Sequence, residues 1–134
     1  MVRVEHIGIA VENLEEVNAL YEKLFDRPAY KTESVTSEHV DTSFFQVGET
    51  KIEFLKATGD QSAIAKYIDK KGQGIHHIAF EVEDIESEMN RLDKEGFVLI
   101  NEVPKKGADN KLVCFLHPKS TNGVLVELCQ EITK

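Results

Sequence analysis

The chain has 134 residues, of which 41% are hydrophobic and 30% are charged, a balance typical of a globular domain. Lys and Arg total 16 against 24 Asp and Glu, and the net charge of −8 argues against nucleic acid or an anionic membrane as the main partner. No apolar run approaches the ~20 residues that span a bilayer, and the N-terminus has no signal-peptide pattern, so we expect a cytoplasmic protein with reduced cysteines.

The first half of the chain predicts a strand, a helix and three further strands. An alternating strand at the N-terminus leads directly to Asn13, which is a good N-cap, with Glu16 three residues later as in a capping box. One side of the helix that follows is apolar and consists of Leu14, Val17, Leu20, Tyr21 and Leu24. Strands are predicted next near residues 29–35, 40–47 and 51–55, separated by turn signals such as the Gly-Glu pair at residue 48.

The second half repeats this order after a short linking helix at residues 62–71. A strand enters a helix capped by Asp84 and stopped by Gly96, and strands are predicted near 98–101, 112–116 and 124–129. Residues 76–89 repeat the pattern of residues 5–17, and His77 matches His6. The sequence therefore predicts an α+β fold with two βαβββ modules, at about 3–56 and 74–131, within a single domain over residues 1–134.

The repeat places the same chemistry in both modules. On the first strand of each module, one face carries bulky residues and the other carries small residues and a histidine, His6 or His77. The last strand of each module carries a carboxylate between apolar neighbours, Glu53 or Glu127, which is costly to bury unless it is paired or binds a cation. Two imidazoles and two carboxylates that converge in one cleft form a divalent transition-metal site.

Ordinary structural roles are the alternative for each residue taken alone. A single histidine at a strand start is more often packed or exposed than a ligand, and a single strand glutamate usually lies at an edge. The coincidence of both at matched positions in both repeats favours a metal. His76 is expected to point to the other face, and ordinary roles are expected for His39 and His117, which have no repeat partners.

Two segments carry a resemblance to a known family. The chain as a whole resembles the vicinal oxygen chelate superfamily, which has the fold of glyoxalase I. SAIAKYIDKKGQGIHHIAFEVEDI at 62–85 and FLHPKSTNGVLVELCQ at 115–130 resemble the methylmalonyl-CoA epimerase family within it. The resemblance implies a curved mixed sheet around a metal-binding cleft, a homodimer, and metal ligands at His6, Glu53, His77 and Glu127. Many epimerases have Gln where this chain has Glu53.

The resemblance also implies a reaction. The proton on C2 of methylmalonyl-CoA lies between a thioester and a carboxylate, and its removal gives an enolate that a divalent metal can stabilise. Glu127 is the first candidate for one acid/base group and Glu53 for the opposite one, with a purely ligating role as the alternative for both. The family's second glutamate on the third strand is replaced here by Thr42, with Asp41 adjacent, so that role would fall to Glu53 or to a bound water.

The phosphates of CoA need cations. The candidate phosphate-binding stretch consists of Lys105, Lys106, Lys111, Lys119 and Ser120, with solvated loop lysines as the alternative for each one. The family resemblance of the His-Pro-Lys-Ser segment favours Lys119 and Ser120 as the CoA-binding residues. The expected partner is therefore an acyl-CoA. The ligand set suits Co, Ni, Zn, Mn or Fe, among which the sequence does not decide.

Two rival functions follow from the same fold. One is glyoxalase I, the lactoylglutathione lyase, which isomerises a glutathione hemithioacetal and usually grips glutathione with arginines. Arg3, Arg27 and Arg91 fall outside the proposed pocket strands. The other is a non-catalytic binding module, whose members typically lack the full ligand set that this chain has.

Overall fold

The computed structural model describes residues 1–133, which form two compact units. Residues 6–76 form the first unit, and residues 1–5 join the segment from residue 77 onward in the second. The element order is βαβββ in each module, with a helix between them, so the α+β architecture predicted from the sequence is confirmed. No helix among residues 1–133 is both long and apolar enough to cross a bilayer.

The first unit contains a mixed sheet with the strand order β2-β3-β4-β1. Its elements are β1 (Arg3–Ala10), α1 (Leu14–Phe25), β2 (Lys31–Val35), the 3₁₀ helix η1 (Thr36–Glu38), β3 (Val40–Val47), β4 (Thr50–Ala57) and the linking helix α2 (Ala63–Lys71). β1 runs parallel to β4, whereas β3 is antiparallel to both β2 and β4. The parallel pairing of the first and last strands brings their side chains together on each face of the sheet.

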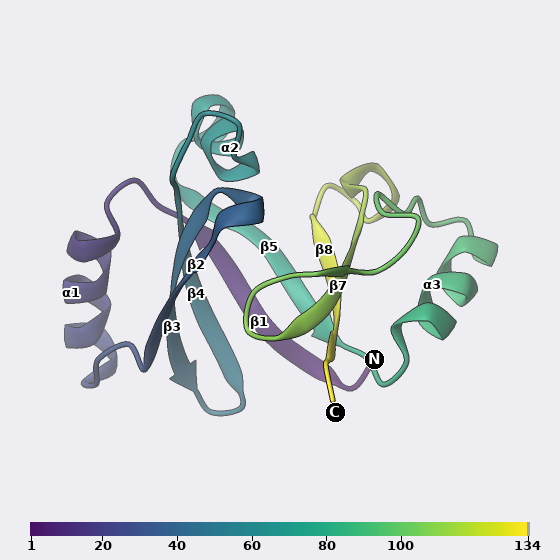
Figure 1. Cartoon of the computed structure of the whole chain (residues 1–134), viewed down its shortest axis with the longest axis horizontal. Coiled ribbons are helices and arrows are strands. Elements are labelled where there is room, and N and C mark those ends of the chain that lie inside the picture. Colours follow the sequence, from purple (N-terminus) through teal and green to yellow (C-terminus); the bar gives the residue numbers. More distant parts are fainter. Residues whose placement is uncertain (134) are drawn as a thin grey trace. The chain divides into compact units, whose positions relative to one another are not determined.

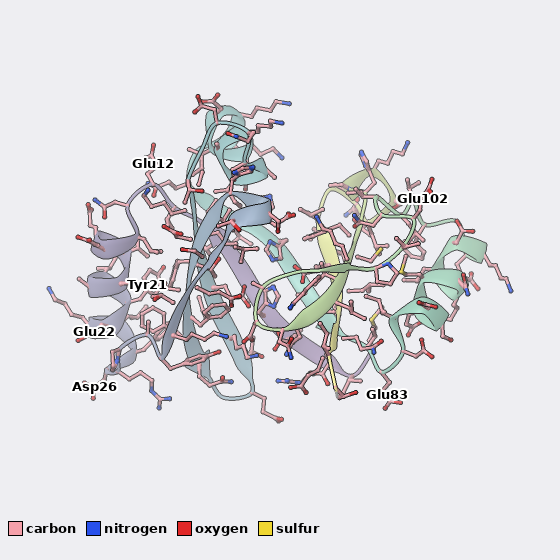
Figure 2. The ribbon with its side chains drawn as sticks, viewed as in Figure 1. Glu12, Tyr21, Glu22, Asp26, Glu83 and Glu102 are labelled. Atoms are coloured by element: carbon pink, nitrogen blue, oxygen red, sulfur yellow. The ribbon has the colours of Figure 1, made fainter. Side chains whose placement is uncertain are left out.

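One face of this sheet packs against α1, which lies beside β3 and β4 (Figure 1). Phe45 and Phe54 are fully buried there, with ring centroids 5.8 Å apart in an edge-to-face arrangement. Tyr21 points from α1 toward the strands (Figure 2), and its ring centroid lies 4.6 Å from that of Phe54. The small face instead packs on α2, where Ala10 contacts a cluster that includes Ile64.

The predicted apolar side of α1 is partly wrong. Leu20 and Leu24 are 61% and 68% exposed, whereas Phe25 packs into the core with Tyr21. The spacing of Leu14, Val17, Tyr21 and Phe25 follows one helical face, and Leu20 and Leu24 lie one position toward the solvent side of it. The helical spacing fits an apolar stripe with Leu20 and Leu24 as well as one with Tyr21 and Phe25. The stripe with the two aromatic residues is the buried one, because its burial removes more apolar surface from water.

The second unit has the strand order β5-β8-β7-β6. Its elements are β5 (Gly74–Glu81), α3 (Ile85–Lys94), β6 (Lys105–Lys106), β7 (Lys111–Leu116), the 3₁₀ helix η2 (Pro118–Ser120) and β8 (Val126–Glu131). β5 is parallel to β8, which is antiparallel to β7. Ile85, Met89 and Leu92 of α3 are buried against the strands.

The strand predicted near residues 98–101 does not form. Leu99 makes only an isolated bridge to Leu116, and the side-chain oxygen of Asn101 accepts the hydrogen bond from the Phe115 backbone N–H at 2.9 Å. That oxygen takes the place of a strand carbonyl, so the ladder stops there. The pairing resumes at Lys105, which begins β6.

Both cysteines are buried and unbridged, as expected for a reduced protein. Burial raises the pKa of the Cys114 thiol, because it removes the charged thiolate from water. A thiol with a raised pKa has little thiolate at neutral pH, so Cys114 is a packing residue rather than a nucleophile.

The N-caps predicted for the two module helices are confirmed. The Asn13 side chain accepts a hydrogen bond from the Glu16 backbone N–H at 3.0 Å, and Asp84 accepts one from the Ser87 N–H at 3.1 Å. Each cap satisfies a donor that the first turn of the helix leaves without an intrahelical partner.

Replacing Asp84 with Ala is expected to lower the free energy of unfolding by about 1 kcal/mol, because the Ser87 N–H loses its acceptor. Urea denaturation followed by circular dichroism measures the loss. The neighbouring exposed Glu83, changed to Ala, is the control and is expected to change stability by less than about 0.5 kcal/mol. Equal losses in the two variants would show that the cap contributes no specific stability.

Candidate metal centre and active site

The first module buries a histidine beside a glutamate. Gly8 of β1 lies opposite Glu53 of β4, and His6 lies two residues before Gly8 on the same face. The Nδ1 atom of His6 lies 3.2 Å from Oε2 of Glu53. Gly8 has no side chain to separate them, so the small residue between the two polar groups allows the contact.

The second module builds the same pair with corresponding residues. Ala79 of β5 lies opposite Glu127 of β8, and His77 lies two residues before Ala79. The Nε2 atom of His77 lies 3.1 Å from Oε1 of Glu127. The ring of His77 also meets the ring of Phe115 edge-on, with centroids 5.7 Å apart and planes at 84°.

The four side chains are buried, with exposed fractions of 5% for His6, 3% for Glu53, 5% for His77 and 5% for Glu127. A buried carboxylate is strongly destabilised unless it is paired or binds a cation. The adjacent imidazole supplies one partner, and a histidine nitrogen beside a carboxylate oxygen is also half of a typical transition-metal ligand set. Each module thus presents one nitrogen and one oxygen donor that fit a divalent metal ion.

His76 is not part of this arrangement, as the sequence predicts. Its ring packs edge-on against Tyr67 of α2, with centroids 4.9 Å apart. The hydroxyl of Tyr67 donates to the Ile75 carbonyl at 2.7 Å, which fixes the aromatic ring against the start of β5. Two adjacent histidines therefore serve different roles because strand neighbours point to opposite faces.

Comparisons with known proteins assign the chain to a family. Residues 5–115 match the model of the Glyoxalase/Bleomycin resistance protein/Dioxygenase superfamily. The ethylmalonyl-CoA/methylmalonyl-CoA epimerase of Cereibacter sphaeroides is 42% identical over 130 residues, which cover 96% of this chain and 97% of that protein. The mitochondrial methylmalonyl-CoA epimerase of Dictyostelium discoideum is 42% identical over 94% of this chain and 76% of that protein.

A solved structure agrees with the family model and with these two relatives. A variant of the Streptomyces coelicolor methylmalonyl-CoA epimerase in complex with 2-nitronate-propionyl-CoA superposes with a TM-score of 0.94 at 28% identity, over 99% of this chain and 96% of that chain. The chain belongs to the methylmalonyl-CoA epimerase family. The glyoxalase-like fold and the resemblance found in the sequence are confirmed, and the chain is an enzyme of the racemase and epimerase class.

β3 has Thr42 at the position where the epimerase family has its second catalytic glutamate. Thr42 lies on the same face of the sheet as Phe44, which is paired with Glu53. Its side chain is fully buried, and its hydroxyl has no hydrogen-bond partner among the described residues. A threonine hydroxyl does not act as an acid or base near neutral pH, so Thr42 does not take the role of a glutamate.

The predicted CoA-binding residues of this epimerase-family chain lie at the turn after β7. Ser120 uses its hydroxyl locally, because Oγ donates to the His117 carbonyl at 2.9 Å and accepts from the Val98 N–H at 3.2 Å. His117 caps the same turn by accepting the Lys119 N–H at Nδ1. The Lys119 side chain is exposed, so a role for Lys119 in binding phosphate stays a prediction, and Ser120 chiefly shapes the turn.

Lys111 belongs to the same lysine-rich stretch of the sequence, but the structure buries it. Its side chain is 9% exposed, and Nζ lies 3.9 Å from Oε2 of the fully buried Glu5. Arg3 places a second cation 3.9 Å from the same oxygen. Burial of Lys111 or of Glu5 without an opposite charge would be costly. The pairing between these two residues explains why Lys111 is not available to an external phosphate.

An open hollow of about 610 Å³ lies between α3 and residues 97–104 in the second unit. Its lining includes Glu86, Asp93 and Glu102, and it contains neither His77 nor Glu127. Three carboxylates in the lining disfavour the phosphates of CoA. This hollow is therefore not the expected substrate site of an epimerase-family member.

Proposed function

We propose that the chain epimerises methylmalonyl-CoA by removing the proton from C2 on one face and returning a proton on the other. The observation that carries this proposal is the duplicated buried His–Glu pair, His6 with Glu53 and His77 with Glu127, in a chain of the methylmalonyl-CoA epimerase family. The C2 proton is acidic because both a thioester and a carboxylate flank it. Its removal by a positioned carboxylate is general base catalysis.

The two glutamates are the proposed acid/base groups. They lie on corresponding strands of the two repeated modules, β4 and β8, opposite Gly8 and Ala79 respectively. A carboxylate has two oxygens, and one can hold a cation while the other accepts a proton. Glu127 is assigned to one face of C2 and Glu53 to the other.

The four side chains are also the proposed ligands of one divalent cation. Their donor set of two imidazole nitrogens and two carboxylate oxygens fits Co, Ni, Zn, Mn or Fe. When bound, the cation would act as a Lewis acid that stabilises the negative charge developing on the thioester oxygen. In each module the proposed nitrogen and oxygen donors already lie close together, 3.2 Å apart for His6 and Glu53 and 3.1 Å apart for His77 and Glu127.

Proton–deuterium exchange at C2 tests the function. Methylmalonyl-CoA is incubated with the metal-loaded protein in D₂O and followed by NMR, beside an assay with methylglyoxal and glutathione. We expect exchange and interconversion of the two epimers in the first assay and no lactoylglutathione in the second. Turnover in the second assay alone would overturn the proposal in favour of a lactoylglutathione lyase, and activity in neither would favour a binding module.

A further inference from the structure

The short hairpin formed by β6 and β7 places a lysine on the face of the second module that carries His77 and Glu127. In the strand register Lys105 lies opposite Val113, and Phe115, two residues further along β7, lies opposite Glu127. Partners across a ladder point to the same face, as do residues two apart on one strand. Lys105, Phe115 and Glu127 therefore share one sheet face.

The contacts agree with the register. The Nζ atom of Lys105 lies 6.0 Å from the centroid of the Phe115 ring, and that ring meets His77 edge-on with centroids 5.7 Å apart. The same aromatic ring thus neighbours both the ammonium and the imidazole. Lys105 is half-buried, whereas Lys106 points to the opposite face and is exposed.

Hydrogen bonds and close packing fix the turn between β6 and β7 in place. The Gly107 N–H donates to the Lys111 carbonyl at 2.9 Å, and a Cβ on Gly107 would lie only 3.0 Å from Cγ1 of Val113. Asp109 and Asn110 adopt φ angles of 58° and 56° at the tip, and Asn110 exchanges hydrogen bonds with Ile132 at 3.1 and 3.3 Å. A segment fixed at its base and its tip loses little entropy when a ligand binds.

Binding of an anionic substrate at this face needs a cation that offsets the negative charge around it. The substrate of the proposed reaction is an anion, the chain carries a net charge of −8, and Glu127 adds a carboxylate at the reacting end. Lys111 also points to this face, but it is engaged by the buried Glu5. Lys105 is half-buried beside an aromatic ring, a position in which its charge is screened less than at the open surface.

We infer that Lys105 binds the carboxylate of the malonyl group and so selects acyl-CoA substrates that carry a carboxylate on C2. This inference rests on the proposed function. The carboxylate is the anionic group next to C2, which the proposed chemistry places at Glu127, whereas the long pantetheine arm keeps the phosphates far from it. A lysine ammonium suits this role because it is a compact charge on a flexible stem.

Binding of two ligands to the metal-loaded protein tests the inference. Isothermal titration calorimetry measures the Kd of methylmalonyl-CoA and of propionyl-CoA, which lacks the carboxylate, for the wild type, Lys105→Gln and Lys106→Gln. Lys105→Gln is expected to weaken methylmalonyl-CoA binding by about 10- to 100-fold, as for loss of one charged hydrogen bond, and to leave propionyl-CoA binding unchanged. Lys106→Gln is the matched control and is expected to leave the ratio of the two Kd values at the wild-type value.

The outcomes separate the inference from the proposed function. If the wild type exchanges the C2 proton and prefers methylmalonyl-CoA, but Lys105→Gln keeps that preference or weakens both ligands equally, the assignment of Lys105 is wrong. If the wild type neither exchanges the proton nor prefers methylmalonyl-CoA, the proposed function fails instead. Lys105→Arg keeps the charge and is expected to restore most of the preference, and thermal unfolding of each variant shows whether the fold is intact.

Discussion

Glu53→Gln and Glu127→Gln are each expected to reduce epimerisation of methylmalonyl-CoA by at least about 100-fold, the usual effect of losing a general acid or base. Glutamine keeps the shape of the side chain and one oxygen donor, but it neither accepts nor returns a proton. Both glutamates are nearly fully buried and contact a histidine, Glu53 at 3.2 Å and Glu127 at 3.1 Å. The variants therefore remove proton transfer while keeping a neutral ligand in place.

Exchange measurements distinguish the two glutamates. If one serves each face of C2, each variant should still exchange the C2 proton of one epimer with D₂O but fail to invert it, and the two variants should act on opposite epimers. NMR on each pure epimer gives the result. The exposed Glu12, changed to Gln, is the control and should behave as the wild type. Exchange and inversion of both epimers at the wild-type rate in both variants would contradict acid/base roles and would mean that the glutamates act only as ligands.

Phe54→Ala is expected to cost about 3 to 5 kcal/mol of the free energy of unfolding, the usual cost of emptying a buried aromatic site. Phe54 is fully buried, and its ring contacts Tyr21 at 4.6 Å and Phe45 at 5.8 Å between centroids. It follows Glu53 on β4 and points to the opposite face, so it anchors the strand that positions the proposed ligand.

Urea denaturation measures this cost, with Leu24→Ala as the control. Leu24 is 68% exposed on α1, so its truncation is expected to change stability by less than about 0.5 kcal/mol. Phe54→Leu keeps most of the volume and should lose less than Phe54→Ala. Equal losses for Phe54→Ala and Leu24→Ala would contradict the packing of α1 on the sheet.

Periodicity and caps were sufficient to predict most of the fold. The repeat in residues 5–17 and 76–89 gave the order of elements, because a strand followed directly by a capped helix has a strong local signature. The alternation of β4 placed Ile52 and Phe54 on one face and Glu53 on the other, and both apolar residues pack on the α1 side.

Other features depended on contacts that a local pattern does not contain. Residues 98–101 look like a strand, but the Asn101 side chain takes the hydrogen bond of the would-be ladder. Leu20 and Leu24 fit an apolar helical stripe as well as Phe25 does, and only packing decides between them. Lys111 resembles an exposed loop lysine until its pairing with Glu5 is known, since Glu5 lies far away in the sequence.

The candidate site was predicted through symmetry rather than through a local motif. Neither His6 nor Glu53 has a specific signature alone, yet each has an equivalent in the second module, and the structure places each histidine beside the glutamate of its own module. The role of Lys105 had no such signal. It depends on a two-residue strand and a register that the sequence pattern did not predict.

The metal content of the purified protein tests the central claim most directly. Inductively coupled plasma mass spectrometry on the wild type, His6→Ala, His77→Ala and His76→Ala counts bound divalent ions per chain. One shared centre predicts one ion per chain in the wild type and in His76→Ala, and its loss in both His6→Ala and His77→Ala. Two ions per chain, with each ligand variant losing only one, would contradict a single centre built from both modules, and no bound ion in the wild type would contradict any such centre.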